Sequence, residues 1–391
     1  MQLVRVCALQ HVMPSYRVPF FDRLGREPGI RLEVWAGERG PAVSLRSAQP
    51  TDGFGFRSIA AYRLGPFFLH PASLAAAFGG RFDVLLLGWS SRTLDLLPAL
   101  GAARLCRVGT VLWGHGYSKQ ETPARRGLRN LIGRAGDAWL FYNHAAAEWF
   151  VAEGHPRERS FVALNALDQG PIQAARAHWL SRHPELEAFW AAHGLRPGEY
   201  VLFVSRLESD KQVDLLLHAI RRVRRLRPAV KLVLVGEGEC GPLLRAQAEW
   251  LGLADAVVFA GPVWGEQELA PWFLGAAVFA FPAAIGLSIL HAFGYGLPVV
   301  TSADLAGHNP EIEALGDGRN GLLYRSADVD DFARRILDLL EQPERRRRMG
   351  EEALATVGGP TGRFTLERMV QGTVQAIRFA ADRAARGRRG R

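Results

Sequence analysis

The feature that most constrains the fold of this chain is a repeated pattern in which short apolar runs alternate with amphipathic stretches. This pattern predicts β-strands joined by helices, and therefore parallel sheets. It restarts at Tyr200–Ser205, after a segment from about Gln169 to Tyr200 that we interpret as a linker because of its proline and polar residues. A chain of 391 residues is also too long for one ordinary domain, so we expect two α/β domains.

The expected strands follow from the apolar runs. In the first half they are Leu3–Ala8, Leu32–Trp35, Val84–Leu87, Gly109–Trp113, Ala138–Tyr142 and Phe161–Leu164. In the second half they are Tyr200–Ser205, Lys231–Gly236, Val257–Gly261, a run that ends near Pro282, Pro298–Ser302 and Gly321–Tyr324. Ligands of such sheets bind outside the carboxyl ends of the strands, so residues that directly follow a strand are the first candidates for a site.

Charge and composition exclude several classes of protein. Three widely spaced cysteines argue against a disulfide framework and a structural zinc site. A net charge of +9 indicates an anionic partner, unless the arginine content reflects genomic bias. No zinc-finger spacing or aromatic RNA-binding motif is present, so we expect no nucleic acid. The first apolar run is short and broken by Arg5 and Gln10, and no apolar run reaches about 18 residues, so we expect neither a signal peptide nor a membrane span.

The stretch Phe281–Val300, FPAAIGLSILHAFGYGLPVV, carries the most informative pattern. It predicts a buried strand that ends near Pro282, a tight turn with Gly286, and a helix over about Leu287–Tyr295 that ends at Gly296. Backbone N–H groups at such a turn, with the positive end of a helix, can bind a nucleotide diphosphate. The pattern is common in α/β domains and is not specific by itself.

Two cations follow the first strand of the second half. Arg206 comes just after the strand end, and Lys211 precedes the next helix. Arginine binds a diphosphate through its planar fork and lysine binds it as a point charge. The alternative is a pair of solvated surface cations. The glycines of Val235–Glu239, VGEGE, add a signal that any strand-to-helix turn could produce.

In combination, these motifs resemble those of glycosyltransferase family 4, whose members are retaining enzymes of the GT-B architecture. The matching stretches are SRL with Lys211, LVLVGEGE, LGLADAVVFAGPV, AAVFAFPAAIGLSILHAFGYGLPVV and PEIEALGDGRNGLLY, with WGHGY and NALD in the first half. The resemblance implies two Rossmann-like parallel-sheet domains that face a central cleft. Residues 1–175 would form the acceptor-side domain, on which a C-terminal helix at about 365–391 packs back, and residues 176–364 would form the nucleotide-sugar-binding domain.

The resemblance also implies roles for individual residues. The donor diphosphate would be bound by Arg206, Lys211 and the backbone of Ile285, Gly286 and Leu287. His115, in WGHGY, would be the catalytic residue beside the transferring sugar. His291 and Glu311 would contact the donor ribose or sugar. No cofactor and no metal are expected, because the cations and N–H groups would neutralise the leaving diphosphate.

Two departures from the family pattern affect these roles. The family's E-x7-E pair falls on Ala283 and His291, so both carboxylates are missing. The imidazole of His291 could share the hydrogen bonds to the ribose, whereas Ala283 cannot replace the carboxylate that contacts the sugar. The glycine pair that follows the first strand in the family is replaced by His11–Phe21, HVMPSYRVPFF. The chain is therefore interpreted as a divergent branch, and impaired catalysis stays open.

The function implied by the resemblance is transfer of a hexose from a nucleotide-diphosphate sugar to a glycan or lipid-linked acceptor, with retention, in bacterial cell-surface polysaccharide or glycolipid biosynthesis. A non-catalytic sugar-nucleotide-binding subunit is the first alternative, because of Ala283. A nucleotide-sugar epimerase with the GT-B fold is the second. A nicotinamide-dependent oxidoreductase is disfavoured, because no G-x-G-x-x-G follows an N-terminal strand.

A basic segment in the first half suggests where the protein resides. Within Ser118–Phe141, the arginines are Arg125, Arg126, Arg129 and Arg134, and leucine and isoleucine residues lie between them. Drawn as a helix, the segment has a basic and an apolar face that suit an anionic membrane surface. Proteins similar to this family often extend lipid-linked or membrane-bound glycans in bacteria, so the resemblance implies a cytoplasmic protein that can be peripheral on the inner face of the cell membrane. An ordinary helix that packs its apolar stripe on the sheet is the alternative.

Overall fold

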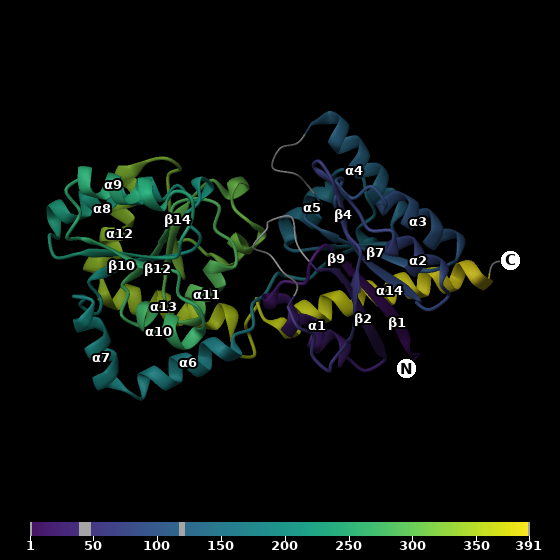
Figure 1. Cartoon of the computed structure of the whole chain (residues 1–391), viewed down its shortest axis with the longest axis horizontal. Coiled ribbons are helices and arrows are strands. Elements are labelled where there is room, and N and C mark those ends of the chain that lie inside the picture. The colour runs from purple at the N-terminus through teal and green to yellow at the C-terminus, as the bar shows by residue number, and fades with distance from the viewer. Residues whose placement is uncertain (1, 39–47, 117–121, 390–391) are drawn as a thin grey trace. The chain divides into compact units, whose positions relative to one another are not determined.

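The computed structural model describes residues 2–38, 48–116 and 122–389, and it divides into two compact units (Figure 1). The first unit extends to Asn165 and includes the C-terminal segment from Leu366. The second unit is Ala166–Thr365. The boundary expected at residues 175/176 lies inside a helix of the second unit, α6 (Gly170–Leu180).

The first unit is built on a seven-stranded sheet with the strand order β3-β2-β1-β6-β7-β8-β9, and all neighbouring strands are parallel. The strands are β1 (Val4–Gln10), β2 (Ile30–Gly37), β3 (Gly55–Ile59), β6 (Val84–Gly88), β7 (Gly109–Gly114), β8 (Ala138–Phe141) and β9 (Ser160–Val162). The sequence did not predict β3 or the antiparallel hairpin of β4 (Tyr62–Leu64) and β5 (Phe67–Leu69), because these edge segments are largely exposed and lack a continuous apolar run.

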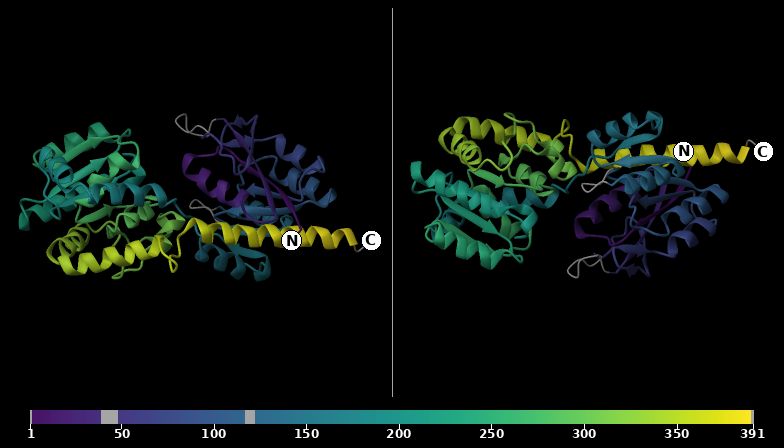
Figure 2. Two further views of the ribbon diagram at one scale, coloured as in Figure 1. Left: turned by 90° about the horizontal axis from the view of Figure 1, so that it is seen from below. Right: turned by 90° about the horizontal axis from the view of Figure 1, so that it is seen from above.

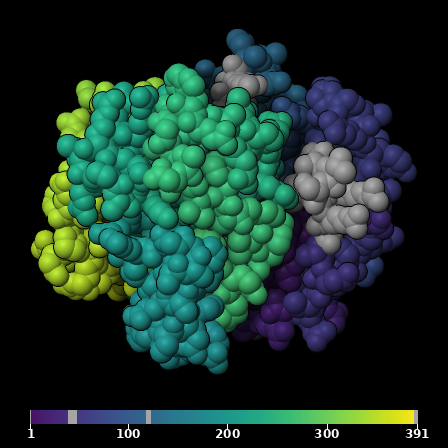
Figure 3. Space-filling view, turned by 60° about the vertical axis from the view of Figure 1, so that its left-hand side comes forward, coloured from purple at the N-terminus to yellow at the C-terminus, as the bar shows by residue number. Residues whose placement is uncertain are grey.

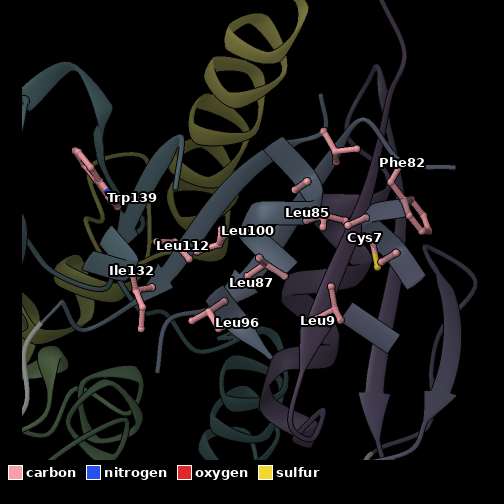
Figure 4. Packing of buried hydrophobic residues seen from close by; sticks show 14 of the residues in the cluster. Cys7, Leu9, Phe82, Leu85, Leu87, Leu96, Leu100, Leu112, Ile132 and Trp139 are labelled. Carbon is pink, nitrogen blue, oxygen red and sulfur yellow. The ribbon is translucent and has the colours of Figure 1, made fainter. Parts of the chain in front are cut away.

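The core of the first unit lies between this sheet and its helices (Figure 4). The helices are α1 (Val18–Gly25), α2 (Ala72–Phe78), α3 (Leu96–Leu105), α4 (Pro123–Ala135), α5 (His144–Ala152) and α14 (Leu366–Arg389). Alternate residues of β6, such as Leu85 and Leu87, join Leu100 of α3 and Leu112 of β7 in one buried cluster. This two-residue period shows that β6 sends side chains to both faces of the sheet, as a central parallel strand does.

The C-terminal helix α14 is far from the first unit in sequence but lies along its sheet (Figure 2). It packs on β7, β8 and β9. Two glycines permit this close approach. A Cβ atom added to Gly109 would lie 2.5 Å from the Ala380 carbonyl oxygen, and one added to Gly372 would lie 2.2 Å from the Val162 carbonyl oxygen. Helix and strand backbones therefore touch at points where no side chain fits.

The second unit contains a six-stranded parallel sheet with the order β12-β11-β10-β13-β14-β15. The strands are β10 (Tyr200–Val204), β11 (Lys231–Val235), β12 (Val257–Gly261), β13 (Val278–Phe281), β14 (Val299–Ser302) and β15 (Gly321–Tyr324). The helices are α6, α7 (His183–Ala192), α8 (Val213–Leu226), α9 (Gly241–Trp250), α10 (Glu266–Leu274), α11 (Ser288–Gly294), α12 (Val329–Glu341) and α13 (Pro343–Val357). In the space-filling view of Figure 3, residues of this unit are coloured from teal through green to yellow.

The interpretation of Gln169–Tyr200 as a linker is wrong, because this segment folds into α6 and α7 and belongs to the second unit. The Trp190 indole donates a hydrogen bond to the Pro271 carbonyl oxygen over 2.8 Å. The Tyr200 hydroxyl donates to the Trp272 carbonyl oxygen over 2.6 Å. Burial of the tryptophan therefore outweighs the polar composition that suggested a linker.

Each sheet has one point at which its strand order reverses. In the first unit it lies between β1 and β6, and in the second unit between β10 and β13. The connections on the two sides of such a point leave in opposite directions and open a crevice at the carboxyl ends of the strands, where ligands bind. The topology therefore selects one ligand-binding edge in each unit.

The contact between α14 and the sheet can be tested with two helical glycines. Gly372→Ala should destabilise the protein, because overpacking against backbone costs about 1–3 kcal/mol. Gly101→Ala in α3 is the matched control, since a Cβ atom there meets nothing within 4 Å. It should stabilise the protein by about 0.5–1 kcal/mol through helix propensity. Thermal unfolding of both variants measures the difference, and equal effects would contradict the close contact.

Candidate functional site

The turn after β13 is the centre of the candidate site. It connects Phe281 to α11, and Ala284 adopts a left-handed conformation with φ 52°. The Thr301 hydroxyl donates to the Phe281 carbonyl oxygen over 2.6 Å, and the Tyr324 hydroxyl donates to the Pro282 carbonyl oxygen over 2.8 Å. Neighbouring strands of the sheet thus hold the start of the turn in place.

The other side of the turn is held by the loop after β14. The His308 side chain, which is 1% exposed, accepts the Ile285 N–H on Nδ1 over 3.0 Å. Its Nε2 lies 2.9 Å from the Ser302 carbonyl oxygen and must therefore carry the proton. The Asn309 N–H donates to the Ile285 carbonyl oxygen over 2.9 Å. A left-handed alanine is strained, and these contacts are what maintains it.

The expected backbone donors are only partly available. The N–H of Ile285 is bound to His308 and cannot also bind a phosphate, which corrects the expectation for this residue. The N–H groups of Gly286 and Leu287 have no acceptor among the residues that the structure describes. Helix α11 is only seven residues long, so its dipole adds less than the two N–H groups themselves. The turn thus offers two donors.

Lys211, which the resemblance implies as a ligand of the donor diphosphate, lies against this turn. Its side chain is 12% exposed, and Nζ lies 2.9 Å from an Asp210 carboxylate oxygen and 3.4 Å from the Ala284 carbonyl oxygen. Because Lys211 follows β10 and Ala284 follows β13, the contact spans the reversal point of the second sheet. It places the ammonium group of Lys211, which is paired with Asp210, against the turn that carries the two N–H donors.

Arg206 follows the same strand but points to solvent. Its side chain is 65% exposed and is paired with Glu208 over 2.6 Å. The glycines of VGEGE support this loop, because a Cβ atom on Gly238 would lie 2.4 Å from the Leu207 carbonyl oxygen. Their role is close backbone packing beneath the Arg206 loop. Arg206 is therefore near the site in sequence and topology, but it is not bound to the turn.

His291 is bound to a carboxylate that the sequence analysis did not select. Its Nε2 lies 2.8 Å from Glu266 Oε2, which also accepts the Tyr295 hydroxyl over 2.9 Å. Burial alone would raise the pKa of Glu266, but its bonds to His291 and Tyr295 outweigh burial and hold this pKa below the usual range. Glu266 opens α10, 25 residues before His291, so only the fold brings them together.

Glu311 and Ala283 complete the set of expected residues in this unit. Glu311 is 4% exposed and lies in the 3-10 turn Pro310–Ala314, directly after Asn309 and its bond to Ile285. Ala283 follows Pro282 at the start of the turn and carries no polar group. The fold therefore brings Lys211, Gly286, Leu287 and the Glu311 segment to one turn.

In the first unit, His115 directly follows β7 and is exposed. Its ring lies 5.0 Å from the Tyr142 ring. The sequence analysis missed Arg17, which is 7% exposed and places its guanidinium 4.6 Å from the Trp113 ring and 5.2 Å from the Tyr142 ring. The sequence offered one signal that could have identified this residue. Arg17 lies within His11–Phe21, the segment that replaces the family's glycine pair. Ring stacking stabilises this buried cation in the described structure.

The basic face expected for the segment Ser118–Phe141 is partly wrong. Residues 118–121 lie outside the described ranges, and the rest of the segment includes α4 and β8. Arg129 is 6% exposed and stacks on Trp149, and Arg126 is paired with Glu153. Leu131 is instead 57% exposed. Helical periodicity placed Arg129 on the solvent side with the other three arginines, whereas stacking on Trp149 favours its burial.

No helix within the described ranges is both long and apolar enough to cross a lipid bilayer.

Comparisons with known proteins extend these observations. Residues 198–342 match the family model described as Glycosyl transferases group 1. The D-inositol 3-phosphate glycosyltransferase of Segniliparus rotundus is 34% identical over 195 residues, which cover 48% of this chain and 41% of that protein. The GDP-mannose-dependent alpha-(1-6)-phosphatidylinositol monomannoside mannosyltransferase of Mycolicibacterium smegmatis is 29% identical over 290 residues, which cover 70% of this chain and 69% of that protein.

A solved structure matches almost the whole chain. The structure of Alr3699/HepE from Anabaena in complex with UDP has a TM-score of 0.69 and 17% identity, and the match covers 97% of this chain and 100% of the other. The fold is therefore GT-B, with two Rossmann-like parallel sheets, as the sequence predicted. The matched part spans about two fifths of the Segniliparus relative. The D-inositol 3-phosphate glycosyltransferase of Nocardia farcinica is 32% identical over 317 residues, which cover 77% of this chain and 66% of that protein. The chain belongs to the group 1 glycosyltransferases, also called glycosyltransferase family 4, and residues 198–342 match the family model.

The contact between Glu266 and His291 predicts a specific loss of stability in acid. The pKa of Glu266 is lower in the folded protein than its ordinary value of 4.5, so its contribution is present above that pH and is lost as the pH falls through the folded pKa. Between about pH 5 and pH 3, the wild type should therefore lose more stability than Glu266→Gln. Urea unfolding across this range measures the effect. Glu268→Gln, at an exposed position of the same turn, should follow the wild type.

Proposed function

We propose that the protein transfers a hexose from a nucleotide-diphosphate sugar to a glycan or lipid-linked acceptor, with retention of configuration at the transferred sugar. The observation that carries the proposal is the turn after β13, where Lys211 and the N–H groups of Gly286 and Leu287 converge at the reversal point of the second sheet. Lys211 and this turn lie inside the region that matches the family. Two relatives are themselves named for transfer of sugar residues.

The charges at the turn suit the chemistry of a departing diphosphate. Cleavage of the bond between sugar and diphosphate leaves negative charge on the diphosphate. Lys211 and the two N–H groups are fixed before the reaction, so they stabilise this developing charge without reorganising. By analogy with oxyanion holes, the loss of one such donor costs about 3 kcal/mol of transition-state stabilisation. Arg206 would bind the diphosphate through its planar guanidinium group after its ion pair with Glu208 breaks. Its side chain is exposed and can therefore reorient.

The pair of His291 and Glu266 is proposed to bind the ribose of the donor. The resemblance places a ribose-binding carboxylate at position 291, where this chain has histidine. Glu266 supplies a carboxylate at this point, with a side chain that is 26% exposed, and one of its oxygens is occupied by His291 and Tyr295. A carboxylate accepts hydroxyl hydrogens. The missing second carboxylate of the family motif is thus compensated from α10.

The sugar-binding part of the proposal rests on His115 and Glu311. Glu311 would accept a hydroxyl of the transferred sugar, and the exposed His115 would act on that sugar as the catalytic residue that the resemblance implies. Ala283 provides no carboxylate, so no protein nucleophile is assigned. The acceptor is proposed to be a polysaccharide chain or a membrane glycolipid, since one relative is named for a phosphatidylinositol monomannoside substrate.

The site of action is proposed to be the inner face of the cell membrane. On α4, Arg125 is exposed together with Leu128 and Leu131, and Arg134 is exposed at the end of the helix. Exposed leucines between cations suit an interface between water and anionic lipid. This smaller set replaces the four-arginine face expected from the sequence.

A panel of UDP- and GDP-sugars, tested by thermal shift, examines donor binding. A donor at 100 times its Kd should stabilise the protein by about 2.7 kcal/mol. Lys211→Met should weaken binding roughly 10- to 150-fold, because a hydrogen bond to a charged group contributes about 1.5–3 kcal/mol. Arg206→Ala should weaken it less. Arg225→Ala, an exposed cation on α8, is the control and should bind like the wild type. Unchanged binding by Lys211→Met would refute the assignment.

A non-catalytic sugar-nucleotide-binding subunit is the second candidate, because Ala283 stands where a carboxylate is expected. Release of nucleoside diphosphate from a bound donor, followed with a coupled assay, separates the two. An enzyme should release it even without acceptor, slowly, and Lys211→Met should suppress this release in proportion to lost transition-state binding. Saturable donor binding with no release would favour the binding subunit.

A further inference from the structure

A small pocket in the first unit lies outside the donor site described above. It is located where the order of the first sheet reverses, between the carboxyl ends of β1 and β6. His11, which follows β1, and Gly88, which ends β6, contribute to its wall. Its volume is about 60 Å³, which accommodates a few waters or one hydroxyl-bearing end of a larger molecule. Topology therefore places this pocket at the ligand-binding edge of the first unit.

A chain of hydrogen bonds lines the pocket. Asp95 is 3% exposed, and its carboxylate accepts the His70 N–H over 2.8 Å and the Ser73 hydroxyl over 2.6 Å. The His70 ring contacts the His11 ring, with 3.1 Å between Nε2 and Nδ1. Asp95 is the N-cap residue of α3, yet its carboxylate makes no capping bond and reaches the start of α2 instead. The carboxylate is thus dedicated to this network.

Asp95 favours one arrangement of the protons on the two rings. His70 Nδ1 lies 3.9 Å from the Asp95 carboxylate, which is beyond hydrogen-bond distance, but the negative charge stabilises the neutral tautomer of His70 that carries its proton on Nδ1. In that tautomer His70 Nε2 accepts a hydrogen from His11 Nδ1. This leaves His11 Nε2 as an unprotonated acceptor. Its contact in the structure is the Thr93 hydroxyl at 3.5 Å, the outer limit of a hydrogen bond.

The network remains neutral at the two histidines. Burial, together with the neighbouring His70, lowers the pKa of His11 to about 4 against an opposing effect of Asp95. Burial also lowers the pKa of His70, again against Asp95. At neutral pH the pocket therefore contains one carboxylate and no cation. Such a pocket repels phosphate and carboxylate groups and favours a neutral hydroxyl, which can donate to an imidazole nitrogen.

We propose that this pocket binds a hydroxyl group of a neutral polyhydroxyl acceptor, such as a sugar or cyclitol, through a hydrogen bond from that hydroxyl to His11 Nε2. His70 and Asp95 act as positioning residues that hold His11 in the required tautomer. The role as an acceptor site rests on the proposed function, whereas hydroxyl binding at His11 does not. The segment that replaces the family's glycine pair thus recognises the molecule that receives the sugar.

The tautomers can be observed directly in the whole 391-residue chain by ¹⁵N NMR of the histidine side chains. His11 should show an unprotonated Nε2 and a protonated Nδ1. Titration with myo-inositol or methyl α-mannoside should shift the Nε2 resonance in a saturable manner. Dioxane, a ring of similar size without hydroxyl groups, should have no effect. A protonated Nε2, or the absence of any response to both hydroxylated probes, would overturn the proposal.

Three variants separate recognition from structure. In saturation-transfer measurements, His11→Phe should abolish transfer from the protein to myo-inositol. His155→Phe is the matched control and should retain it, because His155 is a buried histidine of the same unit that stacks on Phe150 away from the pocket. Asp95→Asn should populate both tautomers of His70, a change that loss of packing alone would not produce. Equal transfer in His11→Phe and His155→Phe would contradict the proposal.

Titration with a nucleotide sugar distinguishes the two possible sources of the bound hydroxyl group, the acceptor and the donor sugar. If UDP-glucose shifts His11 Nε2 while the free hydroxylated probes do not, the pocket recognises the donor sugar and the acceptor assignment is wrong. If the free probes bind at His11 but no nucleotide sugar stabilises the protein, the proposed transferase function fails while the hydroxyl site stands. The converse result, donor binding without any probe effect, removes this inference and leaves the transferase function intact.

Discussion

The reversal of strand order is the constraint on which both candidate sites depend. In the second sheet, β10 and β13 are neighbours in space, although 73 residues separate Lys211 from Ala284. Their parallel pairing puts the two following loops at one edge, where the lysine can contact the turn. In the first sheet, β1 and β6 do the same for His11 and the loop that carries Asp95. The position of each candidate site is therefore set by the parallel pairing of two strands, whichever side chains the two loops carry.

The turn after β13 illustrates how a site can be rigid without an extended helix. A left-handed alanine begins it, and side chains from β14, β15 and the loop after β14 bind its carbonyl or N–H groups. Each contact fixes the backbone conformation of the turn before a ligand binds, so binding costs less conformational entropy. Two N–H groups, those of Gly286 and Leu287, are left without an acceptor among the described residues. The contacts within the protein thus determine which donors of the turn stay available.

Much of this arrangement could be predicted from the sequence because it is local. Apolar runs such as Leu85–Leu87 and the glycine at 286 identify strands and turn without knowledge of the fold. The remaining features depend on contacts between distant residues. Asp95 has the sequence context of a helix cap, but its carboxylate serves residues more than 20 positions earlier. Glu266 and His291 meet only because α10 and α11 are adjacent to one sheet. Helical periodicity could not show that Arg129 faces Trp149.

The position of α14 has a consequence for how the chain folds during synthesis. The first unit lacks its last helix until residues 366–389 have been made, although the rest of its sheet is translated first. The second unit is continuous and lies between these two parts. During translation, the strands β7, β8 and β9 therefore keep the face that receives α14 uncovered while the whole second unit emerges from the ribosome. The unit whose sheet is translated first is therefore completed only after the second unit has been made.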